Sequence, residues 1–144
     1  ADFGCKVFWS VANVISGDPT PDVIGVCLAS QVVEGGLTIK GSSQYVCEAD
    51  GDGYKVVSKT YTNTECSEDD ETVSVTVQSN QDYIDCESPS CPIYEVRVYS
   101  ATPGEDDASQ CTAGDDYFEY VTFVNVCILG YQYRCDDNGV YLDQ

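Results

Sequence analysis

Alternation of apolar and polar side chains is the main pattern along this chain. Over residues 72–77, three valines alternate with threonine and serine, and over residues 94–99 Tyr94, Val96 and Val98 alternate with polar or amphipathic side chains. A period of two places successive side chains on opposite faces of a strand, so both segments predict half-exposed antiparallel strands. No segment of about 11 or more residues shows the apolar spacing of a helix. The predicted fold class is therefore all-β.

Other segments predict buried strands and tight turns. The runs 6–15 and 117–128 carry apolar residues on both faces. The first predicts a strand buried on much of both sides, and the second predicts a long strand in the centre of its sheet. Gly35 and Gly36 separate two short apolar segments and predict a hairpin. Turn residues recur about every ten positions and separate about ten to twelve short strands, a spacing typical of sandwiches or barrels. We expect a disulfide-stapled antiparallel β-sandwich with little or no helix.

An internal repeat is predicted from two similar stretches, 44–57 and 131–143. Each stretch reads strand, cysteine, acidic glycine-bearing turn, tyrosine and strand. When Cys5 is aligned with Cys91, Cys27 falls near Cys111 and Cys47 falls on Cys135, at offsets of 86, 84 and 88 residues. The proline- and serine-rich segment 86–92 marks a boundary. The prediction is two related tandem β-subdomains, residues 1–88 and a shorter 89–144, with packing as one compact unit as the alternative.

Composition indicates an oxidising, extracellular location. Nine cysteines in 144 residues approach the density of disulfide scaffolds. No apolar run reaches the roughly 18 residues of a membrane-spanning helix, and Ala1 is interpreted as the mature N-terminus of a secreted protein. The formal net charge of −19 disfavours binding to nucleic acid and insertion into an anionic membrane.

The cysteines are expected to form a disulfide framework with one member left over. Nine is an odd number, so one cysteine is free or bonded to another molecule. Cys5, near a terminus, and Cys127, which lacks an aligned mate, are the candidates for this role. Eight paired cysteines allow 105 connectivities, so no pairing is predicted. The framework comprises Cys5, Cys27, Cys47, Cys66, Cys86, Cys91, Cys111, Cys127 and Cys135.

The chain lacks the residues of common catalytic sites, and we predict that it is not an enzyme and has no cofactor. It contains no histidine, which excludes Ser-His-Asp triads, Cys-His dyads and histidine-ligated metals. The cysteines lack the CxxC spacing of zinc sites. Glu119 is the only carboxylate within a strongly apolar strand, and a lone carboxylate cannot perform the acid–base work of a glycosidase.

A weak calcium site is the metal alternative. Glu48, Asp50, Asp52 and Gly53 match the first half of an EF-hand loop in their spacing. Position one is glutamate instead of aspartate, and Lys59 stands where a bidentate glutamate belongs. A hairpin turn explains the segment and its echo at 136–139 better, so Asp50 and Asp52 are only weak calcium candidates.

Glycans enter the prediction in two ways. Eleven tyrosines and one tryptophan permit a sugar-binding surface. Thr20, which lies between two prolines, and Thr102, which precedes Pro103, are candidate O-glycan sites that would make the chain a glycoprotein.

The leading functional hypothesis is a secreted structural protein, a subunit of an extracellular fibre, coat or matrix. It would form a homo-oligomer or filament through sheet edges, with an intermolecular disulfide as a second link. The alternative is a monomeric secreted recognition module that binds glycan or protein through its loops.

Overall fold

The computed structural model describes residues 4–17, 20–70, 72–99, 116–125, 127–128, 131–136 and 139–144. Strands make up most of these residues, so the all-β prediction is confirmed. The elements are β1 (Val7–Ser10), α1 (Val11–Ser16), β2 (Asp22–Val23), β3 (Leu28–Glu34), β4 (Leu37–Asp50), β5 (Gly53–Tyr61), β6 (Thr72–Thr76), β7 (Ser79–Ile84), β8 (Ile93–Tyr99), β9 (Tyr117–Phe123), β10 (Cys127–Ile128), β11 (Tyr131–Asp136) and β12 (Gly139–Asp143).

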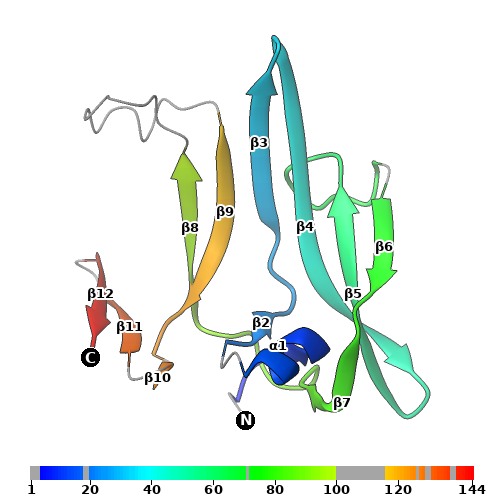
Figure 1. Ribbon diagram of the computed structural model, residues 1–144, viewed down its shortest axis with the longest axis vertical. Helices are drawn as coiled ribbons and strands as arrows, with labels where there is room; N and C mark the ends of the chain where they lie inside the picture. The colour runs from blue at the N-terminus through cyan, green and yellow to red at the C-terminus, as the bar shows by residue number, and fades with distance from the viewer. Residues whose placement is uncertain are drawn as a thin grey trace.

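The described strands form three antiparallel sheets (Figure 1). The largest has six strands in the order β6-β5-β4-β3-β9-β8, and the two smaller sheets have the orders β2-β1-β7 and β10-β11-β12. In Figure 1 the strands of the six-stranded sheet run vertically, with α1 and β2 near its lower part. The long β3–β4 hairpin extends beyond the other strands at the top of the view.

The tight hairpins expected from glycine-bearing turns are present. Gly35 and Gly36 join β3 to β4 with φ angles of 60° and 79°, which glycine adopts without steric cost. The β4–β5 hairpin turns at Gly51, between the paired residues Asp50 and Gly53. Its sequence echo is also a hairpin, β11–β12, in which Asp136 pairs with Gly139. The repeated sequence therefore corresponds to a repeated local structure.

The strand predicted over residues 6–15 is wrong beyond Ser10, where the chain forms α1. The Ser10 hydroxyl accepts a hydrogen bond of 3.2 Å from the Asn13 backbone N–H, which is an N-cap geometry. Gly17 ends the helix in the left-handed region at φ 76°. These capping residues outweigh the strand preference of the β-branched residues between them.

The single strand predicted over residues 117–128 is also wrong at its end. β9 lies in the interior of the six-stranded sheet, between β3 and β8, as the apolar run indicated. It stops at Phe123, and Asn125 adopts a positive φ of 61°, a conformation that asparagine tolerates better than most residues. The following strand β10 belongs to a different sheet.

The two predicted subdomains contribute to one sheet. β3 lies before the boundary at residue 88 and β9 lies after it, and the two strands pair directly at Ser30 with Phe118 and Gln31 with Tyr117. A disulfide also joins Cys5 to Cys91, the two cysteines aligned by the repeat. The two segments therefore share a sheet and a covalent link.

Three disulfides connect the described elements. They are Cys5–Cys91, Cys27–Cys66 and Cys47–Cys86, with Cα–Cα distances of 4.8, 6.0 and 6.2 Å. The prediction that Cys5 is the odd cysteine is therefore wrong, because Cys5 is bonded to Cys91 in the segment before β8. Cys111 lies outside the described residues, as do the side chains of Cys127 and Cys135.

Among the described residues, buried apolar side chains form two clusters instead of one continuous core. The first joins β1 and β2 to the ends of β8 and β9 and contains Val7, Val23 and Phe123. The second joins β1 to β4 and β5 and contains Phe8 and Val56, both with no exposed surface. The small sheet β2-β1-β7 thus packs on the large sheet at two separate places.

Candidate functional site

One face of the six-stranded sheet carries most of its exposed apolar side chains. Directly paired residues of antiparallel strands share a face, and alternate residues along a strand return to it. The register therefore places nine of the ten exposed large apolar residues in the described part of this sheet on the face of Leu28 and Ser43, which we call the apolar face. The nine are Val32, Leu37, Ile39, Tyr54, Val73, Val75, Tyr94, Phe118 and Tyr120.

The small sheet covers part of the apolar face. Val56 on β5 packs against Phe8, and the rings of Phe8 and Tyr45 meet edge to face at 4.8 Å between centroids. The Cys47–Cys86 disulfide ties β4 to the end of β7 and holds the two sheets together. Further along β4, Ile39 and Leu37 are 58% and 71% exposed. The cover therefore ends between Tyr45 and the β3–β4 turn.

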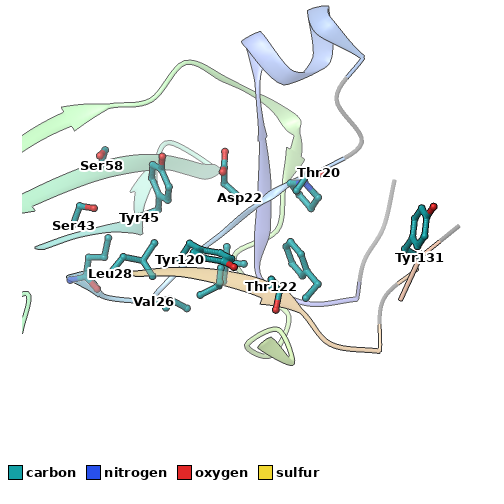
Figure 2. A pocket seen from close by; sticks show the side chains of 15 residues that line it. Thr20, Asp22, Val26, Leu28, Ser43, Tyr45, Ser58, Tyr120, Thr122 and Tyr131 are labelled. Carbon is teal, nitrogen blue, oxygen red and sulfur yellow. The ribbon is translucent and has the colours of Figure 1, made fainter. Parts of the chain in front are cut away.

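A pocket of about 470 Å³ lies at this margin (Figure 2). β4 and β5 contribute Ser43, Tyr45 and Ser58 to one wall, and β9 contributes residues 120–123 to the opposite wall. Val23 and Phe123 belong to the first buried cluster, whereas Tyr45 packs on the second. The pocket therefore occupies the space where the two clusters fail to meet.

Two polar groups give the pocket its electrostatic character. The Tyr45 hydroxyl and the Asp22 carboxylate both line it. Burial raises the pKa of Tyr45 above its usual value, and the negative charge of Asp22 raises this pKa further. The phenol is therefore neutral at physiological pH and retains its proton for hydrogen bonding.

The opposite face, which we call the polar face, is held by charged contacts. Glu119 on β9 accepts hydrogen bonds of 2.6 and 3.0 Å from Arg97 on β8 through one oxygen. Its other oxygen accepts the Ala29 backbone N–H of β3 at 2.9 Å. Arg97 also lies over the Tyr117 ring at 4.1 Å. Hydrogen bonding to Tyr99, and then to Glu119, raises the pKa of Arg97. Glu119 therefore joins three strands and has a structural role.

A second carboxylate supports the same joint between β3 and β9. Direct strand pairing there involves only two residue pairs. Beyond this short ladder, the Val33 backbone N–H donates a 2.7 Å hydrogen bond to Asp116. Carboxylates thus extend the connection on both sides of the paired residues.

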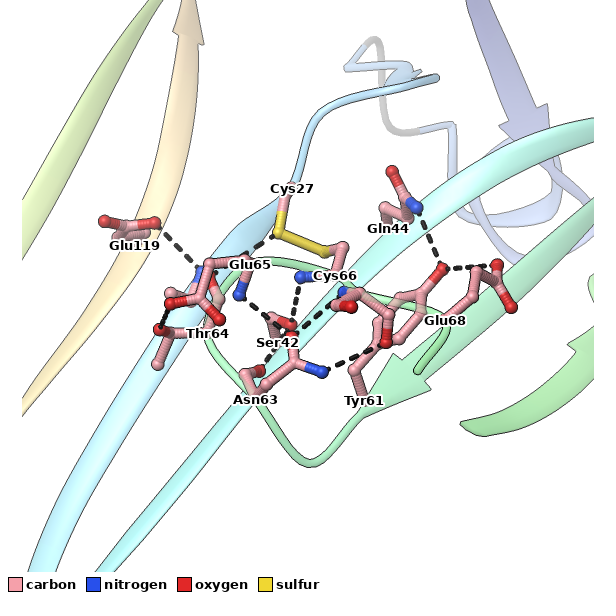
Figure 3. Close-up of a disulfide and its surroundings, with 12 residues drawn as sticks. Cys27, Ser42, Gln44, Tyr61, Asn63, Thr64, Glu65, Cys66, Glu68 and Glu119 are labelled. Atoms are coloured by element: carbon pink, nitrogen blue, oxygen red, sulfur yellow. Dashed lines mark hydrogen bonds between the residues drawn. A yellow bond between two sulfur atoms is a disulfide. The ribbon is translucent and has the colours of Figure 1, made fainter. Parts of the chain in front are cut away.

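The loop after β5 packs on the polar face around the Cys27–Cys66 disulfide (Figure 3). The buried Ser42 hydroxyl donates to the Asn63 carbonyl oxygen at 2.6 Å and accepts the Cys66 N–H at 3.1 Å. The Asn63 side-chain oxygen accepts the backbone N–H groups of Glu65 and Ser67, both at 3.0 Å. These bonds fix the loop in place, including Cys66 at its positive φ of 52°.

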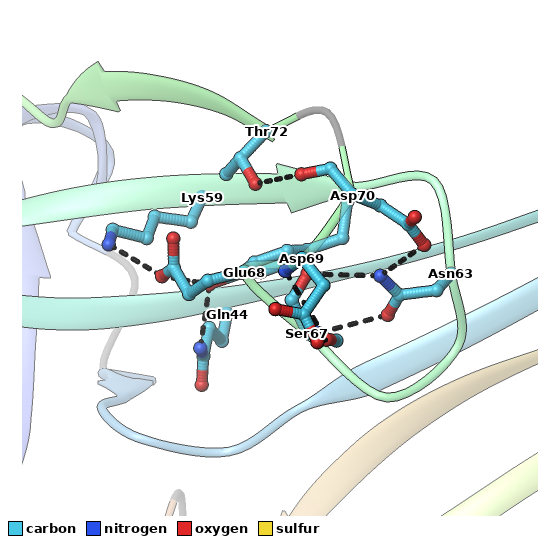
Figure 4. A network of polar contacts seen from close by, with 9 residues as sticks. Gln44, Lys59, Asn63, Ser67, Glu68, Asp69, Asp70 and Thr72 are labelled. Carbon is cyan, nitrogen blue, oxygen red and sulfur yellow. Dashed lines mark hydrogen bonds and ion pairs between the residues drawn. The ribbon is translucent and has the colours of Figure 1, made fainter.

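The acidic segment 67–70 is part of this structure (Figure 4). Glu68 accepts bonds from Lys59 at 2.8 Å and from the Tyr61 hydroxyl at 3.2 Å. The hydrogen bond from Lys59 lowers the pKa of Glu68. Asp70 accepts a bond from the Asn63 amide at 3.0 Å. The carboxylates of Glu68 and Asp70 in this segment thus stabilise the loop.

The proposed metal and glycan residues lie away from the pocket or outside the described chain, with one exception. Asp50 and Asp52 are exposed at the β4–β5 turn, and no group of three or more acidic or cysteine ligands gathers among the described residues. Thr20 is exposed beside β2 and lines the pocket. Thr102 lies outside the described residues. The calcium and glycan hypotheses remain predictions.

The pocket residues were not identified from the sequence. Asp22, Tyr45 and Tyr120 are far apart in the chain and meet only through the sheet register and the packing of β2. Tyrosine in a strand is a common half-buried residue, so neither tyrosine had a distinguishing signal. Alternation did assign each strand an apolar side, but it did not show which parts of that side are covered.

The architecture defines a class: a mostly β, antiparallel, disulfide-bonded protein of the kind found in oxidising environments. No helix among the described residues is long and apolar enough to cross a membrane. Comparison with known proteins found no matching family model, no matching curated protein and no matching solved structure.

Proposed function

We propose that this protein is a secreted structural subunit of an extracellular fibre, coat or matrix, assembling through its six-stranded sheet. The observation that carries the proposal is the set of nine exposed large apolar side chains on the apolar face. Exposed apolar side chains gathered on one face of a protein mark an interaction site when they form large patches. Face-to-face stacking of sheets is a common way to bury them.

The outer strands of the same sheet suit edge-to-edge contact. β6 has the sequence TVSVT, without charge or proline, and its Val73 and Val75 are 58% and 59% exposed. Natural edge strands are normally protected by charges, prolines or bulges. β8, at the other edge, carries Glu95 and Arg97. Pairing of β6 with β8 of the next copy is heterologous, and a heterologous contact that does not close into a ring builds a filament.

Cysteine arithmetic supports a covalent link between copies. Six of the nine cysteines are paired in the three disulfides. The remaining Cys111, Cys127 and Cys135 can form at most one bond among themselves. At least one of them is therefore available for an intermolecular disulfide, and non-reducing electrophoresis of the native material should show a ladder that collapses on reduction.

The net charge of −19 opposes assembly because neighbouring copies repel each other. Salt and divalent cations screen or bind these charges. Light scattering and electron microscopy of the wild-type protein should therefore show larger assemblies as sodium or calcium chloride is added.

The decisive variant is Val73→Lys/Val75→Lys, which adds two positive charges to the β6 edge. We expect it to remain monomeric at salt concentrations where the wild type assembles. The matched control is Val11→Lys/Val14→Lys on α1, where the valines are 37% and 44% exposed. It makes the same change in charge and should assemble like the wild type. A wild-type monomer at every concentration and salt level contradicts the proposal and favours a monomeric recognition module that binds through its loops.

A further inference from the structure

The pocket beside Tyr45 has the size of a ligand site. Its volume of about 470 Å³ falls within the roughly 300–1,000 Å³ typical of small-molecule sites.

The walls of the pocket are mainly apolar and aromatic. Val26 and Leu28 approach from the β2–β3 side, and Tyr120 approaches from β9 (Figure 2). Phe123 of β9 also lines the pocket. Two strands on either side hold these walls: β4 and β5 pair over nine residues, and β9 is anchored to β8 over seven. The site is therefore preformed, which lowers the entropic cost of binding a rigid ligand.

Charge narrows the class of ligand. Asp22 is the one carboxylate among the described residues that line the pocket. Its negative charge helps to raise the pKa of Tyr45. The overall charge of −19 adds a long-range repulsion for anions. The described residues that line the pocket include no Lys or Arg to bind a carboxylate or phosphate group.

We propose that this pocket binds an uncharged, ring-containing, largely apolar small molecule that carries a hydrogen-bonding group for the Tyr45 hydroxyl. The apolar walls exclude water from the rings, and the neutral phenol fixes their orientation. The pocket shares Tyr120 with the exposed apolar face. Val73 and Val75, the β6 residues of the proposed edge contact, do not line it, so substitutions there test assembly without altering the pocket wall.

The test uses two fluorescent probes that differ in charge, N-phenyl-1-naphthylamine (neutral) and 1-anilinonaphthalene-8-sulfonate (anionic). Titrations are made at a protein concentration that sedimentation shows to be monomeric. We expect saturable binding of the neutral probe at one site per chain, with the anionic probe bound at least about tenfold more weakly. Asp22→Asn should strengthen binding of the anionic probe several-fold and change binding of the neutral probe less.

Blocking variants locate the site. Ser43→Trp places an indole at the pocket wall and should weaken binding of the neutral probe at least about tenfold. Ser58→Trp, on the neighbouring strand, is a second blocking variant if the first does not fold by circular dichroism. The matched control is Ser74→Trp, an exposed serine on the opposite face of β6, which should bind like the wild type.

Three results overturn the proposal: binding without saturation, equal binding of both probes by the wild type, or wild-type affinity in both folded blocking variants. Ile39→Ser distinguishes the main alternative, in which the probe lies on the exposed end of the apolar face. Loss of binding in Ile39→Ser together with retention in Ser43→Trp assigns the probe to that surface and rejects the pocket.

Discussion

The two faces of the six-stranded sheet differ in what stabilises them in water. The polar face carries the Arg97–Glu119 pair and the loop fixed to Ser42 and Asn63, and these polar groups are bonded within the chain. The apolar face depends on a cover. The small sheet supplies that cover over Val56 and Tyr45, and the exposed remainder is the surface that we assign to assembly.

This difference shows that alternation of apolar and polar residues does not by itself make both faces of a sheet stable in water. A polar face needs only that its hydrogen bonds are made, whether or not another layer lies over it. An apolar face gains stability only where a second layer removes it from water. Stability and function are therefore expected to separate along the apolar face, with stability in its covered part and binding in its exposed part.

Two disulfides give the largest expected effect and a direct comparison of the faces. Cys27–Cys66 lies on the polar face and Cys47–Cys86 joins the apolar face to its cover, and both have a sequence separation of 39 residues. Loop closure alone predicts a loss of about 4 kcal/mol on removal of either bond. We expect Cys47→Ala/Cys86→Ala to cost more than Cys27→Ala/Cys66→Ala, because it also loosens the cover. Urea unfolding measures both, and equal losses contradict the distinction.

The next test compares one valine in the covered part of the apolar face with one valine in its exposed part. Val56 has no exposed surface, whereas Val75 is 59% exposed. Val56→Ala removes buried methyl groups and leaves a cavity, so we expect a loss of about 2 kcal/mol in the free energy of unfolding. Val75→Ala should cost less than about 0.5 kcal/mol in the monomer. A similar loss at both positions, measured by urea unfolding of monomeric protein, contradicts the separation of stability from assembly.

Several strands and turns of the six-stranded sheet were predictable from local sequence. Alternation at Val73 and Val75 predicted β6 and its two faces, and Gly35-Gly36 predicted the hairpin that joins β3 to β4. Local patterns failed at α1, where the capping geometry of Ser10 and Gly17 overrides a valine-rich sequence.

The long-range features were not predictable, for a physical reason. The pairing of β3 with β9 joins residues nearly ninety positions apart, and the bond from Ala29 to Glu119 spans 90. Neither carries a local signal. The pocket also depends on this topology, because its walls are strands that become neighbours only after the sheet has formed. Cysteine spacing left 105 pairings open, so the bond that holds the cover could not be distinguished from the one on the polar face.

The ion pair on the polar face is expected to have a smaller effect than the buried valine. Glu119→Gln removes the charge that faces Arg97 and keeps an oxygen that can accept the Ala29 N–H. The arginine is 43% exposed, so solvent screens the pair and we expect a loss of up to about 1 kcal/mol that shrinks in high salt. Glu95→Gln, an exposed change on the same face of β8, is the control and should be nearly neutral. Urea unfolding at low and high salt measures the difference, and a salt-independent loss contradicts an ionic contribution.

The smallest expected effect concerns the cover and depends on pH. Asp85 follows β7 and accepts bonds from the Ser88 hydroxyl at 2.7 Å and from the backbone N–H groups of Ser88 and Glu87. The Ser88 hydroxyl is the main cause that lowers the pKa of Asp85 below its usual value, and burial partly opposes it. The folded state therefore prefers the carboxylate. Its contribution is present above the usual pKa of about 3.9 and is lost as the pH falls through the lower folded value.

Asp85→Asn should consequently destabilise the protein at pH 7 by less than about 1 kcal/mol, given the solvent screening of this site, and the difference from wild type should decrease below about pH 4. Asp52→Asn makes the same charge change at the exposed β4–β5 turn and controls for the general relief of repulsion in a chain of net charge −19. Thermal unfolding of the three proteins across this pH range isolates the contribution of Asp85. A deficit that stays constant down to about pH 2 would mean that the asparagine disturbs the turn sterically. In that case the segment joining β7 to Cys86 is held by shape, and the charge of Asp85 has no part in keeping the cover on the apolar face.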